Sequence, residues 1–346
     1  MKKIISLILC LVLACAISGC GEAKPVLKVY NAGEYIDTSL LSAFEKGNGC
    51  KVVYETFDSN ESMYTKVMSG EQYDIIIPSD YMIERLLKEG YLQEIDKSKL
   101  SNYDGIIPSL LSQPFDKENK YTVPYFWGTV GILYDKTVVE EEDLASGWEL
   151  LRNPKYKDDI YMYDSERDAF MIALKALGYS QNTSDKAELD AAYNWLVEQR
   201  DLVNPIYVGD EVIDSMVSGN KSIAIVYSGD AAYIMSENEN LGYFEPNEGT
   251  NSWIDAMVIT KDCQSTELAH KFIDFMIAPE NAVKNSETVG YTSSVMSVFD
   301  ELKETVYSGN SAYNPRQNGE NDEFFRYQDT ETKKYCAELW TKVKAQ

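Results

Sequence analysis

The segment YDIIIPSDYM, residues 73–82, decides the expected fold. Ile75, Ile76 and Ile77 make a strand that is apolar at every position, which is typical of a parallel strand covered on both faces. Pro78 and Ser79 end this strand, and a helix is predicted from Asp80 to Lys88, stopping at Gly90. A buried strand followed directly by a helix indicates an α/β sheet.

The preceding residues repeat the same alternation. Strands are predicted at 26–30 and 51–56, and helices at 38–46 and 60–68, the first of which is expected to stop at Gly47. The β-α-β-α-β order is that of a doubly wound fold. Further along the chain we expect strands at 130–134, 222–227 and 253–260, helices at 168–177, 186–202, 265–278, 280–287 and 330–344, and a polar loop at 308–322.

Length and composition limit the classes of protein. The 346 residues predict two domains, and a hydrophobic content of 44% excludes a wholly disordered chain. With 32 basic and 56 acidic side chains the net charge is 32 − 56 = −24, which argues against a nucleic-acid partner and is compatible with a cationic one. A single histidine, His270, makes multi-histidine metal sites and most Ser/His or Cys/His catalysis difficult to assemble.

The N-terminus has the pattern of a secretory signal followed by a site of lipid attachment. Lys2 and Lys3 precede an apolar run at 4–17, which is too short to span a bilayer comfortably and has the layout of a secretory signal. The run ends in ISGC (17–20), which resembles the lipobox of bacterial lipoproteins. We therefore expect a signal peptide at 1–19, lipidation of Cys20 and a tether at 20–25. The alternative is an ordinary signal peptide with an incidental cysteine.

Three cysteines remain after Cys20, namely Cys50, Cys263 and Cys336. They are few, odd in number and widely spaced, so they predict no disulfide framework, and at least one of them is expected to be a buried free thiol.

Acidic and aromatic residues repeatedly follow the predicted strands, where ligands of open α/β sheets bind. A protonated alkylamine needs carboxylates for charge-assisted hydrogen bonds, aromatic faces for the cation and its methylenes, and neutral acceptors for the remaining N–H groups. The sequence supplies the carboxylates Glu34, Asp168, Asp230 and Asp255, the aromatic residues Tyr35, Tyr81, Tyr227, Trp253 and Tyr291, and the neutral partners Ser79 and Gln328.

Each candidate also has a structural interpretation. Asp168 falls in the first turn of a helix, where it would complement the helix dipole, and Asp230 could be an N-cap. Glu34 and Tyr35 fit a solvated loop, and any one of 25 tyrosines is more often core or surface than site. Trp253 and Asp255 are stronger candidates, because strand alternation places both on one face.

Several catalytic motifs are missing from the sequence. It contains no phosphate loop, dinucleotide fingerprint, C-x-x-C pair, H-E-x-x-H or G-x-S-x-G. Spacing alone leaves glycoside hydrolysis by paired carboxylates open.

The chain from Val26 to its C-terminus resembles the spermidine/putrescine-binding proteins of bacterial ABC importers. The resemblance is carried in order by VYNAGEYI (29–36), SNESMYTKVMSGEQYDIIIPSDYM (59–82), LQEIDKSKL (92–100), YTVPYFWGTVGILYDK (121–136), ALGYSQNTSD (176–185) and SWIDAMVI (252–259). It implies a periplasmic-binding-protein fold of type II topology, with two α/β lobes and a ligand cleft between them. Lobe 1 would comprise 26–130 and 254–300, and lobe 2 would comprise 131–253 and 301–346.

The resemblance also implies a ligand site made of the same candidates: Glu34, Tyr35, Ser79, Tyr81, Asp168, Tyr227, Asp230, Trp253, Asp255, Tyr291 and Gln328. Three positions depart from the family pattern. Ala32 stands where an aromatic residue is usual, Tyr227 where Trp is common, and Ser165 where some members have a carboxylate. These departures leave the preference between putrescine and spermidine open.

The expected function is that of a lipid-anchored, extracytoplasmic substrate-binding protein that passes polyamines to a membrane permease and, through it, an ATPase. We expect a monomer with no enzymatic activity, cofactor, metal or nucleic-acid partner. The alternatives are a binding protein for a sugar or a ferric complex, an extracellular carboxylate-dependent hydrolase, and an adhesin or sensor ectodomain.

Overall fold

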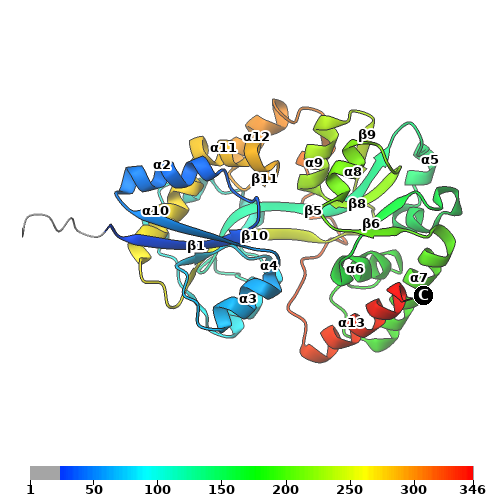
Figure 1. Ribbon diagram of the computed structural model, residues 1–346, viewed down its shortest axis with the longest axis horizontal. Coiled ribbons are helices and arrows are strands. Elements are labelled where there is room, and N and C mark those ends of the chain that lie inside the picture. Colours follow the sequence, from blue (N-terminus) through cyan, green and yellow to red (C-terminus); the bar gives the residue numbers. More distant parts are fainter. Residues whose placement is uncertain (1–23, 346) are drawn as a thin grey trace, which may run out of the picture.

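The computed structural model describes residues 24–345, which form two α/β lobes joined through a curled sheet (Figure 1). The strand order is β2-β1-β3-β10-β5-β8-β6-β7, with β4 paired to β10 and with β9 and β11 paired to β5. The strands are β1 (Val26–Ala32), β2 (Lys51–Phe57), β3 (Ile75–Ile76), β4 (Leu92–Gln93), β5 (Val123–Asp135), β6 (Ile160–Tyr163), β7 (Ile206–Val208), β8 (Ile223–Tyr227), β9 (Leu241–Phe244), β10 (Ser252–Thr260) and β11 (Thr292–Ser293).

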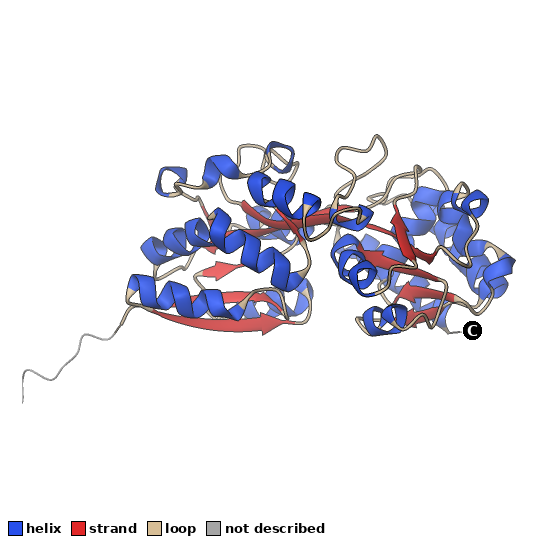
Figure 2. Ribbon diagram, turned by 90° about the horizontal axis from the view of Figure 1, so that it is seen from above, coloured by secondary structure: helices blue, strands red, loops and turns tan. Residues whose placement is uncertain are grey.

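Helices cover the sheets of both lobes, as Figure 2 shows from above. They are α2 (Thr38–Asn48), α3 (Asn60–Met68), α4 (Asp80–Lys88), α5 (Glu141–Leu144), α6 (Glu166–Ala176), α7 (Lys186–Val203), α8 (Val212–Val217), α9 (Ser228–Glu237), α10 (Thr266–Met276), α11 (Pro279–Val289), α12 (Met296–Glu304) and α13 (Thr330–Lys344). Short 3-10 helices occupy Lys97–Lys99, Tyr103–Gly105, Pro108–Leu110, Gly147–Arg152, Pro154–Tyr156 and Ser311–Tyr313.

The alternation expected from the first part of the sequence is present. β1 pairs in parallel with both β2 and β3, which gives the doubly wound order β2-β1-β3. The fully apolar run is buried as expected, but only Ile75 and Ile76 form ladder pairs, and Ile77 lies beyond the strand. The predicted stop at Gly47 was wrong. Helix α2 continues to Asn48 and ends at Gly49, whose left-handed φ of 62° suits glycine.

Strand β5 belongs to both lobes. Residues 123–129 pair antiparallel with β10, whereas residues 130–134 pair antiparallel with β8. Figure 1 shows β5 and β10 running together through the middle of the molecule. Gly128 lies on this passage, and a Cβ atom there would stand 2.6 Å from Cζ2 of Trp253. A side chain at position 128 would therefore displace the indole ring.

The second lobe contains elements that the sequence pattern missed. The short strands β6, β7 and β9 and the helices α5 and α8 were not predicted, and neither was α12, which packs against α11 and β11 of the first lobe. β6 pairs in parallel with β7 and β8, and Figure 1 shows α6, α7 and α13 on one side of these strands and α8 and α9 on the other. Strands of three or four residues are too short to show a period, which explains why they escaped.

The described residues do not include the predicted signal peptide 1–19, Cys20 or most of the predicted tether 20–25. Within residues 24–345, no helix combines the length and apolar character needed to cross a bilayer. The three cysteines of this part of the chain are unpaired, and Cys50 and Cys336 are buried, which confirms the expected buried thiol.

Candidate functional site

Acidic and aromatic side chains meet where β5 and β10 pass from one lobe to the other. They come from the loop after β1, from β6, β8 and β10, from the first turns of α6 and α9, and from the segment before β11. We call this group the interlobe cluster; its members are Tyr35, Tyr163, Asp168, Tyr227, Asp230, Trp253, Asp255 and Tyr291.

Asp255 lies on β10, next to a bulge between Asp255 and Ala256. Its Oδ2 accepts a hydrogen bond of 2.7 Å from the hydroxyl of Tyr35. Its Oδ1 is buried and has no hydrogen-bond partner among residues 24–345. Burial raises the pKa of Asp255, because a carboxylate is poorly solvated there. This carboxylate therefore has an acceptor position open to a further donor.

Asp230 lies in the first turn of α9, and Tyr227 rather than Asp230 occupies the N-cap position. Its two oxygens accept hydrogen bonds of 2.8 Å from Tyr163 and 2.8 Å from Tyr291. Burial raises the pKa of Asp230 to about 6, although both hydroxyls oppose this shift. The N-capping interpretation is thus replaced by a carboxylate held between two tyrosines.

Asp168 is 3% exposed in the first turn of α6. Its Oδ2 accepts a hydrogen bond of 2.9 Å from Tyr227, and its backbone N–H donates to the capping hydroxyl of Ser165 at 3.3 Å. Burial raises the pKa of Asp168, while Ser165 and Tyr227 partly counteract it. The carboxylate therefore does more than complement a helix dipole, because it is desolvated and held by a ring from the neighbouring strand.

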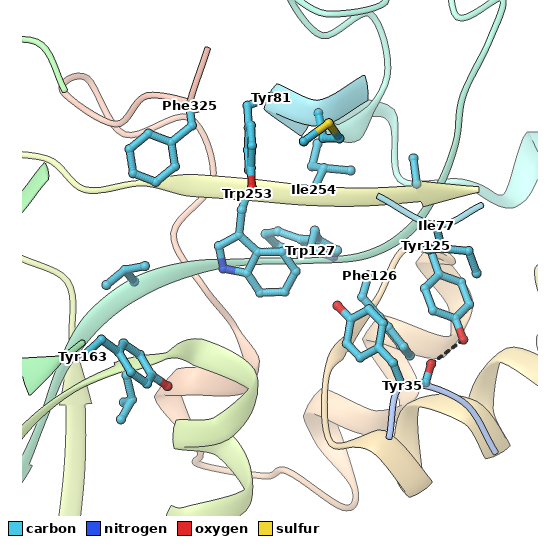
Figure 3. Packing of buried hydrophobic residues seen from close by; sticks show 14 of the residues in the cluster. Tyr35, Ile77, Tyr81, Tyr125, Phe126, Trp127, Tyr163, Trp253, Ile254 and Phe325 are labelled. Atoms are coloured by element: carbon cyan, nitrogen blue, oxygen red, sulfur yellow. Dashed lines mark hydrogen bonds between the residues drawn. The ribbon is translucent and has the colours of Figure 1, made fainter. Parts of the chain in front are cut away.

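A continuous row of aromatic rings joins the three aspartates. Ring centroids are 5.3 Å apart for Tyr35 and Tyr291, 5.5 Å for Tyr291 and Trp253, and 6.3 Å for Trp253 and Tyr227. Figure 3 shows the Trp253 ring projecting from β10, with Phe126 and Tyr35 on one side and Tyr163 on the other. Trp253 is 7% exposed, and its buried Nε1 has no partner among the described residues.

Four predicted site residues are not members of this cluster. Ser79 forms an isolated bridge with Asp255 and exchanges hydrogen bonds with Asn60. The hydroxyl of Tyr81 lies 3.2 Å from both carboxylate oxygens of Glu61. Among residues 24–345, no hydrogen bond connects Glu34 or Gln328 to the interlobe cluster. Glu34 is exposed with a left-handed φ of 50°, and Gln328 is half-buried.

Sequence reasoning missed several residues of the site. Tyr163 ends β6 and could have been found by its position after a strand, had that short strand been recognised. Asp80 belongs to the quoted segment and is 1% exposed. Its carboxylate accepts from the backbone of Tyr81 at 2.6 Å and of Ile254 at 3.4 Å. Burial raises the pKa of Asp80 well above its usual range, and the nearby Asp255 adds to this shift.

The arrangement suits a flexible cation. The three aspartates of the cluster accept hydrogen bonds from neutral tyrosine hydroxyls. They are also desolvated, which is costly for a carboxylate without a cationic partner. Each has its own tyrosine, so each is a separate acceptor position along the row of rings. The described residues contain no group of three or more His, Cys, Asp or Glu side chains placed to hold a metal ion.

Comparison with known proteins agrees with this geometry. The family model of the bacterial extracellular solute-binding proteins matches residues 39–309. The chain is 35% identical over 289 residues to the spermidine/putrescine-binding periplasmic protein of Salmonella typhimurium, covering 83% of this chain and 82% of the relative. It is 30% identical to the putrescine-binding periplasmic protein SpuD of Pseudomonas aeruginosa, covering 100% and 99%.

Solved structures agree as well. The substrate-binding protein PotD of a spermidine/putrescine ABC transporter from Streptococcus pneumoniae superposes with a TM-score of 0.82 at 37% identity, covering 92% of this chain and 98% of the other. The expected periplasmic-binding-protein fold is thereby confirmed. The chain belongs to the bacterial extracellular solute-binding proteins.

Proposed function

We propose that this protein is the substrate-binding subunit of an ABC importer and that it captures spermidine, putrescine or both. The observation that carries the proposal is the set of three aspartates, Asp168 buried and Asp230 and Asp255 partly buried, each held by tyrosine hydroxyls along one row of aromatic rings. The printed names of the relatives, which describe spermidine- and putrescine-binding proteins, support it.

The roles of the residues follow from their chemistry. Trp253 and the tyrosines line the methylenes of the ligand, because aromatic faces favour both alkyl groups and nearby cations. Asp255 and Asp168 each take an ammonium group, and Asp230 or Glu34 takes the far end. A ligand with a single ammonium group leaves buried carboxylates unpaired, which costs about 1–3 kcal/mol for each one. This asymmetry is the source of selectivity for polyamines.

The lobes are proposed to close on the ligand. We assign residues 26–130 and 254–300 to the first lobe and 131–253 and 301–346 to the second. Residue 300 lies within α12, so moving this boundary to the end of the helix keeps the helix whole. A ligand that contacts both lobes favours the closed form by its differential affinity. The closed form then docks on a permease whose partner ATPase supplies the energy.

The attachment of the protein to the cell is proposed from its sequence. Cys20, directly after the predicted signal peptide 1–19, carries lipid and anchors the mature chain on the outer face of the membrane. The mature protein is proposed to act as a monomer without enzymatic activity.

Isothermal titration calorimetry of the mature chain tests the proposal. Putrescine and spermidine are titrated beside maltose and ferric citrate, which stand for the two other ligand classes. We expect heat from at least one polyamine only. No heat with either polyamine far above micromolar concentration would refute the proposal, and heat with maltose or ferric citrate alone would replace it.

A variant tests the site itself. Asp255→Asn keeps an oxygen for the Tyr35 hydroxyl but removes the charge, so polyamine affinity should fall more than tenfold. Asp262→Asn makes the same change at an exposed position after β10 and serves as the control. Wild-type affinity of Asp255→Asn would discredit the assignment.

A further inference from the structure

A cation of the protein itself lies at one end of the interlobe cluster. Arg167 precedes Asp168 in the first turn of α6. Its guanidinium carbon lies 3.8 Å from the ring centroid of Tyr81 and 5.0 Å from that of Phe325. Tyr81 comes from α4 of the other lobe, and Figure 3 draws its ring above that of Trp253. One face of Tyr81 is therefore covered by a cation.

The anion at this end is Glu61 of α3. The Tyr81 hydroxyl lies 3.2 Å from both Glu61 oxygens, and Nη2 of Arg167 lies 3.9 Å from Oε1. At Asp168, Asp230 and Asp255 a carboxylate accepts a hydrogen bond from a tyrosine hydroxyl beside an aromatic face. Glu61 and Tyr81 repeat this combination. The difference is that the cation position at Glu61 is already filled by an arginine.

Arg167 is held loosely, and its guanidinium is only partly buried. Its ion pair with Glu61 is long, and its Nη1 is buried without a hydrogen-bond partner among residues 24–345. The side chain of Arg167 is 22% exposed and that of Glu61 is 55% exposed, so both side chains reach solvent. Ring stacking is the closest contact that holds the guanidinium in place.

We propose that Arg167 is a specificity-determining residue that fills a fourth ammonium position and thereby ends the binding site after three. This inference rests on the proposed polyamine function. With Arg167 present, a fourth ammonium group at Glu61 meets a like charge on the same aromatic face. Without it, Glu61 and Tyr81 offer that ammonium group a carboxylate and a ring. Arg167 therefore sets the length of polyamine that the protein accepts.

The test compares affinities for a diamine, a triamine and a tetraamine, with putrescine, spermidine and spermine as probes. In Arg167→Met, we expect affinity for spermine to rise about tenfold relative to spermidine, because one charge-assisted contact is gained. The ratio between spermidine and putrescine should stay near that of the wild type. Arg167→Lys keeps the charge and should keep the wild-type ratios, and adding Glu61→Gln to Arg167→Met should remove the gain.

Arg326→Met is the matched control. The guanidinium of Arg326 donates hydrogen bonds of 3.0 and 2.6 Å to the carboxylate of Glu84 on α4. Like Arg167 it pairs with a glutamate, but it does not stack on Tyr81. The spermine-to-spermidine ratio should therefore be unchanged in this variant. An equal change for all three amines in Arg167→Met, or none, overturns the inference while the polyamine function stands. If the wild-type protein binds none of the three, both fail together.

Discussion

Replacement of Asp230 by asparagine should stabilise the ligand-free protein while weakening ligand binding. Burial raises the pKa of Asp230 from its ordinary 3.8 to about 6. Each pKa unit corresponds to about 1.4 kcal/mol, so holding the charged form at pH 7 costs on the order of 3 kcal/mol of folding free energy. Asparagine keeps one acceptor oxygen, and one of the hydroxyls of Tyr163 and Tyr291 loses its partner at a cost of about 1 kcal/mol. The net gain is about 2 kcal/mol.

The sign of the pH dependence follows from the raised pKa. Between pH 3.8 and 6 the folded state binds more protons at Asp230 than the unfolded state, so this group lowers stability as pH rises and its cost is complete above about pH 6. At pH 5 the cost is about 1.6 kcal/mol. The advantage of Asp230→Asn should therefore shrink to less than about 1 kcal/mol at pH 5.

Calorimetric unfolding of the ligand-free mature protein measures both quantities. We expect the Tm of Asp230→Asn to exceed that of the wild type by roughly 3 °C at pH 7 and by much less at pH 5. Asp262→Asn controls for the change of net charge. An asparagine variant that is less stable than the wild type at pH 7, or whose effect does not depend on pH, would show that Asp230 is not a desolvated carboxylate.

Two further predictions concern packing and the lobe contact. In Gly229→Ala the new Cβ stands 2.6 Å from Cε2 of Tyr291, so the ring must move and polyamine affinity should fall at least tenfold. Gly47→Ala, on α2 with open space around the new Cβ, is the control and should leave the affinity unchanged. Titration calorimetry measures both affinities. Burial alone would raise the pKa of Glu84, but hydrogen bonds from Arg326 and Tyr327 lower it to about 2. Glu84→Gln should lower the free energy of unfolding by about 1–3 kcal/mol at pH 7, measured by urea unfolding. This difference from the wild type should disappear as pH falls from 4.5 through 2, because Glu84 then becomes protonated in the folded protein. A difference that persists at pH 2 would refute the pairing of Glu84 with Arg326.

The sequence predicted the elements whose apolar runs are long and the residues whose chemistry is distinctive. The apolar run at 75–77 and the helices around it predicted the first lobe, because a buried parallel strand leaves a pattern of its own. Trp253 and Asp255 were placed together by strand alternation, and both belong to the interlobe cluster. The second lobe was predicted from the resemblance to a known family.

What could not be predicted depends on contacts between distant parts of the chain. Asp230 and Tyr163 are 67 residues apart, and no local pattern records that one holds the other. The sequence gives no signal for Arg167, because its stacking on Tyr81 forms only when the two lobes meet. Glu34 carries a carboxylate like Asp255, but it is exposed and has a left-handed φ of 50°.

The course of β5 restricts where this chain can be lengthened. Since residues 123–129 and 130–134 of one strand supply ladders to different sheets, a single inserted residue between them would turn every later side chain of the strand to the opposite face. Residues 130–133, which are buried on both faces of the strand, would then meet the wrong packing partners while the other lobe stayed intact. The polar stretch 308–322 contains a 3-10 helix with the buried Tyr313, so a reporter domain for an optical sensor is better inserted at its exposed residues 317–318.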